Sequence, residues 1–332
     1  MNPAPQRGFK GALIVRLRNW VGEVALGLPV LAQLADAGYE LHLIGRPWAA
    51  GLLAGHGWPV HTHPRSTWAA VSQLAALKRR LTATDPLFPH RTNTLLLTTS
   101  LSSALEARCA GLRACGAAAE GRGPLLARAV QLQTGLHVVE SYWRVAATLS
   151  GTGTPPATTV LRTSPDHEGI ARALLASHQI HARYAVLCPF SGAGDTAGRR
   201  RWPGFTALIR WLREGGITPI ICNAGAAEAD LARRDFPAAV IPDPMPLGAY
   251  AALMRDAWCT IANDTGPGHL AAIAGARLVS LYGPESFKTT WMPPEGPRAT
   301  LLQNAARWQT VEEVIDQLSA ITSLDPVLDA TS

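Results

Sequence analysis

One glycine-rich segment, residues 258–283, constrains the fold more than any other part of the chain. It reads W-C-T-I-A-N-D-T-G-P-G-H-L-A-A-I-A-G-A-R-L-V-S-L-Y-G. Two short apolar runs, 258–262 and 278–282, are typical of buried strands, and the Ala-rich stretch 269–274 between them is typical of a short packed helix. Strand, loop, helix and strand form one β-α-β unit, which predicts a parallel sheet.

The loop of this unit is a candidate binding site. Open parallel sheets bind ligands beyond the carboxyl ends of their strands. We expect a tight loop at 266–268, where the N–H groups of Thr265, Gly266 and Gly268 would meet anionic oxygens at a helix N-terminus. Asp264 and Thr265 suit sugar hydroxyls and phosphate, and His269 could donate to a phosphate oxygen. The same pattern also fits a purely structural turn with a capping aspartate.

Both halves of the chain alternate strands with helices. Residues 12–17 and 39–44 are expected to be strands around a helix at 23–37, a β-α-β unit with a right-handed crossover. Turn-forming residues without apolar periodicity, S-G-T-G-T-P-P-A-T-T at 150–159, predict a linker. The second half has expected strands and helices at residues 185–188, 205–212, 218–222, 226–234, 239–241, 247–254 and 311–321.

This pattern predicts an α/β protein with two Rossmann-like domains that face each other across a cleft. We expect the first domain to span residues 1–155 and the second 156–332, with the closing helix able to pack back on the first. A chain of 332 residues is long enough for two such domains. Ligands would then bind between the halves.

Composition narrows the functional classes. With 47% hydrophobic and 16% charged residues, the chain is globular, not disordered. Since no apolar run reaches the ~18 residues of a membrane span and no secretory signal is visible, we expect a cytoplasmic protein. Five dispersed cysteines without a C-x-x-C pair predict reduced thiols and no metal site. The net charge of +6 predicts anionic partners, but dispersed Lys and Arg without a binding motif argue against nucleic acid.

Three other positions carry candidate chemistry. Glu23 opens the first helix after the first strand. A carboxylate there could be a general base, or only a first-turn acid that the helix dipole stabilises. The segment 189–203, P-F-S-G-A-G-D-T-A-G-R-R-R-W-P, follows a strand and ends in arginines suited to phosphate, or is a solvated basic loop. Its glycines depart from the dinucleotide fingerprint, which disfavours an NAD(P)-dependent oxidoreductase. Glu228, at a later strand–helix turn, could hold ribose hydroxyls or begin a helix.

Together these motifs resemble glycosyltransferase family 9, the ADP-heptose:lipopolysaccharide heptosyltransferases. N-D-T-G-P-G-H-L-A-A-I-A-G followed by L-V-S-L-Y-G-P is similar to the family's D-T-G-x-x-H-L-x-A-A signature and its trailing strand. P-F-S-G…R-R-W-P is similar to h-P-G…K-x-W-P, the turn at Gly225–Glu228 to G-G-x-x-E, and L-I-V-R-L…V-G-E-V…L-P to the N-terminal R-x-x-x-G-D-x-x-x-x-x-P pattern. The similarity is strongest in the C-terminal half, and residues 47–151 give no specific match.

The resemblance implies a GT-B fold with an acceptor-binding N-terminal domain and a nucleotide-sugar-binding C-terminal domain. It implies inversion at the anomeric carbon without a metal or other cofactor, with Glu23 as the base that deprotonates the acceptor. It also implies an anionic glycolipid acceptor, and hence contact with the inner face of a membrane. Glu23 stands where the family has Asp, and Arg200 stands where it has Lys.

The resemblance also assigns the donor site. Ser191, Gly192, Thr265 and Gly266 would bind the diphosphate, and Asp264 the donor sugar. Glu228 and Met245 would lie near the nucleoside. With Arg200 and His269, the expected donor-binding residues are Ser191, Gly192, Arg200, Glu228, Met245, Asp264, Thr265, Gly266 and His269. Two alternatives stay open: a related transferase with another nucleotide-sugar or acceptor, and a protein that binds a nucleotide-sugar without turnover.

Overall fold

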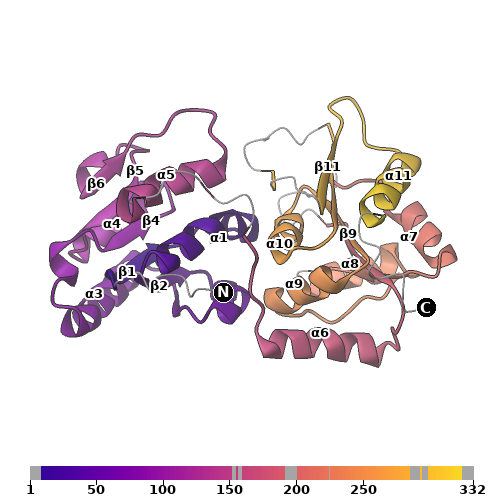
Figure 1. Ribbon diagram of the computed structural model, residues 1–332, viewed down its shortest axis with the longest axis horizontal. Coiled ribbons are helices and arrows are strands. Elements are labelled where there is room, and N and C mark those ends of the chain that lie inside the picture. Colours follow the sequence, from indigo (N-terminus) through magenta and orange to yellow (C-terminus); the bar gives the residue numbers. More distant parts are fainter. Residues whose placement is uncertain are drawn as a thin grey trace, which may run out of the picture. The chain divides into compact units, whose positions relative to one another are not determined.

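Two parallel sheets, one in each half of the chain, form the framework of the protein (Figure 1). The computed structural model describes residues 9–151, 155, 159–190, 200–223, 225–284, 292–293 and 298–323. The chain divides into two compact units. The first contains Met1–Leu53 and Gly57–Thr159, and the second contains Ala54–His56 and Val160–Ser332.

The sheet of the first unit has the strand order β3-β2-β1-β4-β5-β6, and its strand pairs are parallel. Its strands are β1 (Gly11–Arg16), β2 (Tyr39–Gly45), β3 (Val60–Thr62), β4 (Thr94–Leu96), β5 (Ala114–Ala117) and β6 (Arg128–Val130). Its helices are α1 (Val21–Asp36), α2 (Pro47–Leu53), α3 (Thr67–Thr84), α4 (Leu101–Cys109) and α5 (Val138–Ser150), with short 3₁₀ turns at Phe88–His90 and Gly123–Leu125.

The opening β-α-β unit confirms the sequence prediction to within two residues at each end. Every residue of β1 is buried, because the strand lies inside the sheet with helices over its faces. α1 packs against α5, and α3 packs against α4. The stretch 47–151, which matched no motif, therefore supplies most of this unit's strands and helices.

The sheet of the second unit has the order β11-β10-β9-β7-β8, again with parallel pairs. Its strands are β7 (Tyr184–Cys188), β8 (Thr218–Ile221), β9 (Cys259–Asn263), β10 (Leu278–Tyr282) and β11 (Ala299–Gln303). Its helices are α6 (Pro165–Ser177), α7 (Phe205–Glu214), α8 (Ala226–Asp235), α9 (Leu247–Asp256), α10 (Gly266–Ala274) and α11 (Val311–Thr322), and η1 (Ala54–His56) is a 3₁₀ turn. The strand expected at 239–241 is reduced to one bridge between Val240 and Ile220.

The prediction of a tight loop at 266–268 was wrong, because these residues form the first turn of α10. Pro267 suits a first turn, since its missing N–H would have no partner within the helix. Gly275 ends the helix with a φ of 76°, as predicted for a glycine at this position. The closing helix α11 packs in the core of the second unit through Val314, Leu318 and Ile321.

The contact between α6 and α9 leads to a prediction about stability. A Cβ at Gly248 of α9 would overlap the buried imidazole of His167 on α6. We therefore expect Gly248→Ala to lower the free energy of unfolding by about 1–3 kcal/mol, as overpacking does. Gly169→Ala on α6, where an added Cβ meets open space, should instead stabilise by up to ~1 kcal/mol. Urea unfolding of both variants checks this, and a stabilised Gly248→Ala would contradict the packing.

A second prediction concerns pH. The backbone N–H of Arg162 donates to Nε2 of His56 at 3.1 Å, and burial lowers the pKa of His56 to about 4. Between this pH and the ordinary value of about 6.5, the unfolded chain binds more protons than the folded one. The stability that neutral His56 contributes is therefore complete above pH 6.5 and is lost as the pH falls towards 4.

We expect the urea midpoint of the wild type to fall over this window. His56→Gln should flatten part of the fall, because the amide oxygen of Gln can accept the same bond without titrating. Burial also lowers the pKa of His61 and His167, so some slope will remain. The exposed His178 is the control, and a His178→Gln profile as flat as that of His56→Gln would refute the assignment.

Candidate functional site

Each sheet has one point at which the strand order reverses. In the first unit the chain builds outwards from β1 to β3 and then places β4 on the other side of β1. In the second unit it builds from β7 to β8 and then places β9 on the other side of β7. The two loops that leave such adjacent strands run in opposite directions and open a crevice, which is where α/β sheets bind ligands. We call these places the first and second switch points.

Glu23 lies at the first switch point, in the first turn of α1. Arg18, in the loop after β1, donates from Nη2 and Nε to Oε1 of Glu23 at 2.6 and 3.1 Å. Arg18 also donates from Nη1 to the hydroxyl of Thr99, at 3.3 Å, in the loop after β4. Oε2 of Glu23 accepts the backbone N–H of Trp20 at 3.3 Å, as the acid of a capping box does. Glu23 thus takes part in the capping box of α1, and its carboxylate lies against the loop after β1, where the sequence predicted it.

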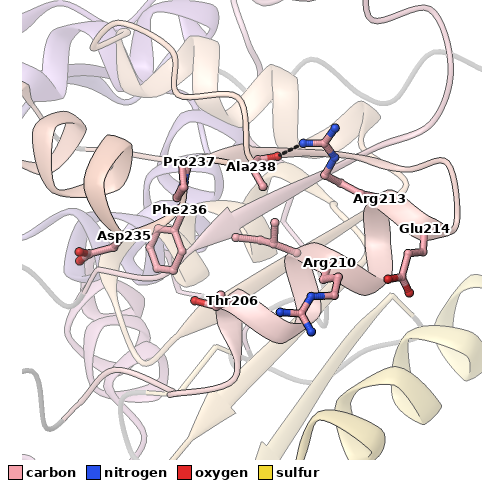
Figure 2. Close-up of a pocket in the computed structure, with 9 residues that line it drawn as sticks. Thr206, Arg210, Arg213, Glu214, Asp235, Phe236, Pro237 and Ala238 are labelled. Carbon is pink, nitrogen blue, oxygen red and sulfur yellow. Dashed lines mark hydrogen bonds between the residues drawn. The ribbon is translucent and has the colours of Figure 1, made fainter.

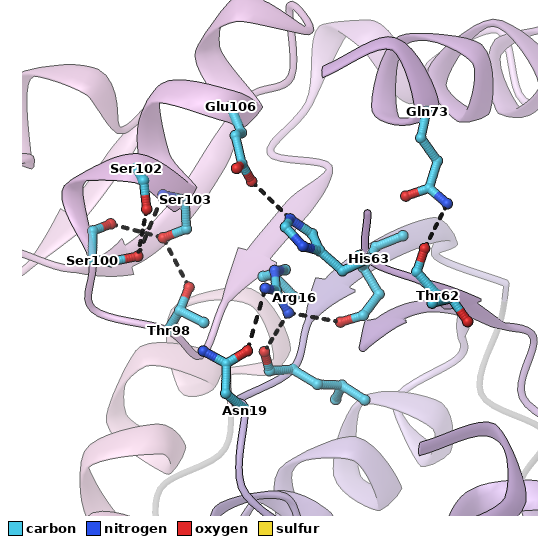
Figure 3. Close-up of polar contacts among 12 residues, drawn as sticks. Arg16, Asn19, Thr62, His63, Gln73, Thr98, Ser100, Ser102, Ser103 and Glu106 are labelled. Atoms are coloured by element: carbon cyan, nitrogen blue, oxygen red, sulfur yellow. Dashed lines mark hydrogen bonds and ion pairs between the residues drawn. The ribbon is translucent and has the colours of Figure 1, made fainter. Parts of the chain in front are cut away.

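A largely buried polar cluster in the first unit includes Arg16, His63 and Glu106 (Figure 3). Arg16, at the end of β1, donates to the carbonyl oxygens of Leu17 and Ile44, at 2.9 and 3.4 Å. Burial lowers the pKa of Arg16 to about 10, against the opposing effect of Glu106, so Arg16 remains a cation at neutral pH. His63 and Glu106 lie 3.0 Å apart between Nε2 and Oε2. The end of β1 therefore holds a buried cation, Arg16, whose charge is partly offset by the carboxylate of Glu106.

Four of the expected donor residues meet at the second switch point: Arg200, Asp264, Thr265 and Gly266. Arg200 donates from Nη2 to Oδ2 of Asp264 at 2.9 Å and to the Asp264 carbonyl at 3.0 Å. The Arg200 side chain is 41% exposed, so a ligand can still approach the guanidinium. Asp264, expected to contact the donor sugar, is therefore also the residue that holds Arg200.

The N-terminus of α10 points into the same region. Thr265 is its N-cap, with extended backbone angles. The N–H of Gly268, one of three donors expected to face an anion, instead bonds the Thr265 carbonyl at 3.1 Å. The N–H groups of Thr265 and Gly266 make no hydrogen bond within the part of the chain that the structure describes. His269 follows in the helix and its side chain is buried.

The remaining expected residues lie on neighbouring elements or outside the described residues. Ser191 and Gly192 fall in 191–199, outside the described residues. Glu228 is half-buried in the first turn of α8, which follows β8, the neighbour of β7. Met245 is half-buried in the segment before α9.

Sequence reasoning missed the buried amide of Asn263, which organises the second switch point. Its Oδ1 accepts the backbone N–H of Trp202 at 3.1 Å, and its Nδ2 donates to the carbonyl of Pro189 at 2.7 Å. Asn263 thus ties the end of β9 to two positions on either side of residues 191–199. Arg18 and Thr99 were also missed. Arg18 could have been found from its position four residues before Gly22 and five before Glu23. No local sequence pattern marks Thr99 or Asn263 as a site residue.

A pocket of about 320 Å³ lies between α7 and the turn at 235–238 (Figure 2). Its lining combines the Phe236 ring and Ile209 with the arginines Arg210 and Arg213, and Arg213 donates to the Ala238 carbonyl at 3.1 Å. None of the expected site residues lines it.

Across the described ranges, no group of three or more His, Cys, Asp or Glu side chains is placed to hold a metal ion. No described helix has the length and apolar character needed to cross a membrane.

Comparison with known proteins agrees with this architecture. Residues 90–319 match the profile of "Glycosyltransferase family 9 (heptosyltransferase)". A family 9 glycosyl transferase from Veillonella parvula superposes with a TM-score of 0.79 at 16% identity, covering 96% of this chain and 99% of that one. The sequence matches no curated protein.

Two Escherichia coli structures are also similar. ADP-heptose lps heptosyltransferase II superposes with a TM-score of 0.74 at 18% identity, over 95% of this chain and 99% of that one. Heptosyltransferase WaaC, solved with ADP-2-deoxy-2-fluoro heptose, superposes with a TM-score of 0.65 at 19% identity, over 92% of this chain and 99% of that one. At these identities the likeness is one of fold, and it confirms the expected GT-B class.

The Asn263 bridge generates a prediction. Asn263→Ala leaves the Trp202 N–H and the Pro189 carbonyl without their partner, each at a cost of about 1–3 kcal/mol. Because Ser191 and Gly192 lie between these two positions, we expect the affinity for ADP to fall about ten-fold as well. Isothermal titration with ADP and urea unfolding measure the two effects.

Gln309→Ala is the matched control. Gln309 is a buried amide that donates to the carbonyl oxygens of Tyr282 and Leu302, at 3.1 and 2.9 Å. Its loss should destabilise the second unit by a similar amount and leave ADP affinity unchanged. Equal ADP affinities for wild type and Asn263→Ala would show that the bridge has no influence on nucleotide binding.

Proposed function

The chain belongs to glycosyltransferase family 9, and we propose that it transfers heptose from ADP-heptose to the inner core of lipopolysaccharide, with inversion. Membership in the family makes it a glycosyltransferase. The donor is proposed because similar folds include an Escherichia coli heptosyltransferase solved with an ADP-heptose analogue. The acceptor is proposed from the structure titled as an ADP-heptose lps heptosyltransferase.

One observation supports this mechanism most directly: Glu23 lies at the first switch point, with its carboxylate held by Arg18. An inverting transfer needs one base and no covalent nucleophile. In the proposed step Glu23 takes the proton of the acceptor hydroxyl as its oxygen bonds the anomeric carbon. The bond between that carbon and the phosphate oxygen breaks, and its electron pair leaves with ADP.

The leaving diphosphate is proposed to bind at the second switch point. Arg200 supplies a half-exposed guanidinium, and the N-terminus of α10 supplies N–H groups and the positive end of a helix dipole. These groups stabilise negative charge as it develops on the diphosphate, the role that a divalent cation has in other transferases. Ser191 and Gly192 complete the proposed diphosphate site, and Glu228 and Met245 the nucleoside site. His269, in the first turn of α10, is proposed to donate to a phosphate oxygen of the donor.

The first unit is proposed to bind the acceptor and the second the nucleotide-sugar. An anionic glycolipid fits the net charge of +6 and the buried cation Arg16 at the end of β1. Such an acceptor is made at a membrane, so we propose a cytoplasmic enzyme that contacts the inner face of the inner membrane. Nucleic acid is not a proposed partner.

Replacing the base provides the test. Glu23→Gln keeps an acceptor for the capping bonds and for Arg18 but cannot take a proton. We expect turnover of ADP-heptose with a lipid A–Kdo acceptor to fall by about 10²-fold or more, as for loss of a general base. ADP-heptose binding, measured by isothermal titration, should stay as in the wild type.

The chain contains a matched control for this substitution. Glu313 occupies the same place in the capping box of α11 and pairs with Arg307 at 2.7 Å, as Glu23 pairs with Arg18 at 2.6 Å. Glu313→Gln should therefore share any structural cost and leave turnover unchanged. A wild type that binds ADP-heptose without turnover would favour a binding protein. Selective binding and transfer with UDP- or GDP-sugars would reassign the donor.

A further inference from the structure

Exposed apolar side chains gather at the carboxyl edge of the first sheet. Eight large apolar side chains are exposed among the described residues, and four of them follow strand ends at this edge. Trp20 and Trp68 are 75% and 81% exposed, and Leu101 and Leu105 are 47% and 45% exposed. Each exposed tryptophan forgoes the free energy of burying a large apolar surface, and a group of such side chains at one edge marks an interaction surface.

The topology places these four side chains along one line. Trp20 follows β1, Trp68 opens α3 after β3, and Leu101 opens α4 after β4. These strands are parallel and lie in the order β3-β2-β1-β4, about 4.8 Å apart, so their carboxyl ends share one edge. Leu105 lies one helical turn after Leu101 on the same face of α4. Trp20 and the leucine pair thus flank the first switch point, and Trp68 lies two strands further along the same edge.

Basic side chains are interspersed with them. Arg46 follows β2 and Arg65 follows β3, and both are exposed. Neither side chain forms an ion pair with a residue that the structure describes. Arg18 and Glu23 neutralise one another, and the exposed acid nearby is Glu120, which accepts the N–H of Leu101 at 3.3 Å. Excess positive charge therefore accompanies the apolar surface. We call Trp20, Trp68, Leu101, Leu105, Arg46 and Arg65 together the aromatic rim.

We propose that the aromatic rim docks on the surface of an anionic lipid bilayer, an inference that rests on the proposed lipid-linked acceptor. Tryptophan prefers the membrane interface, where its ring is apolar and its N–H meets water. Arginine is attracted to the negative headgroups of anionic lipids. The leucine pair on α4 enters the acyl boundary as the apolar face of an interfacial helix does.

A bilayer explains the rim better than a bound sugar does. Sugar rings stack on aromatic faces, but they offer nothing to the exposed leucine pair on α4. A bilayer accepts aromatic, aliphatic and basic groups spread over several loops at once. Docking at this edge would also bring the base Glu23 close to an acceptor that stays anchored in the membrane, so the acceptor would not have to leave the bilayer.

Vesicle flotation of the whole protein tests the proposal, with vesicles of phosphatidylcholine with and without phosphatidylglycerol. We expect the wild type to float with the anionic vesicles only. Arg46→Ala and Arg65→Ala should each lower the partition coefficient about five-fold at low salt. Trp68→Ala and Leu105→Ala should each lower it about ten-fold, because each removes a large apolar side chain from the bilayer interface.

Matched controls lie at the opposite edge of the same unit. Leu87 is 67% exposed and Arg79 is exposed near the end of α3, so Leu87→Ala and Arg79→Ala should float as the wild type does. Failure of the wild type to bind anionic vesicles, or equal binding by rim and control variants, would overturn the proposal. Circular dichroism of each variant verifies that the fold is intact.

Turnover with a water-soluble, deacylated acceptor separates this proposal from the proposed function. Trp68→Ala and Leu105→Ala should keep wild-type turnover on that acceptor while losing vesicle binding. Reduced turnover in solution with unchanged vesicle binding would assign the rim to the acceptor sugar and refute bilayer docking. A wild type that binds vesicles but transfers no sugar in solution would refute the proposed function and leave the rim's role intact.

Discussion

An arginine–carboxylate pair at the reversal of strand order is the interaction on which both halves of this protein depend. In a parallel sheet the loops at a switch point diverge, so the crevice between them needs a link of its own. Arg18 bonds Glu23 and also Thr99 from the loop after β4, and Arg200 bonds the side chain and the carbonyl of Asp264. In the first unit the guanidinium bonds groups on both sides of the crevice, and in the second it reaches from the segment after β7 to the residue that follows β9.

These pairs are partly buried, which gives them chemical consequences. Glu23 and Asp264 have side chains 12% and 25% exposed, whereas Glu313, in an equivalent capping box, is 45% exposed. A carboxylate and a guanidinium held in a shielded crevice interact more strongly with an incoming charge than they would in water. In the proposed mechanism, the same carboxylate that caps α1 also takes the proton of the acceptor hydroxyl, so one side chain would serve both stability and chemistry.

The second switch point is kept rigid by its own set of contacts. Asn263 ties β9 to Pro189 and Trp202, and the Trp202 indole donates to the Gln309 carbonyl at 2.8 Å. α10 approaches the sheet so closely that a Cβ at Gly268 would lie 3.3 Å from Ala262 and from the Asn263 carbonyl. A fixed helix N-terminus would suit the proposed diphosphate, because preorganised groups stabilise developing charge without reorganising during the reaction.

The sequence by itself determined the α/β class, the parallel β-α-β units, the glycine that ends α10 and the family, because burial patterns and helix ends depend on neighbours within a few residues. It misplaced the start of α10, since Gly266, Pro267 and Gly268 suit a loop and a first helical turn equally well. Only the tertiary structure decided that Arg18 meets Thr99, 81 residues away, and that Asn263 joins Pro189 to Trp202. Such contacts depend on which strands become neighbours, and strand order is set by the packing of the whole sheet, not by local sequence.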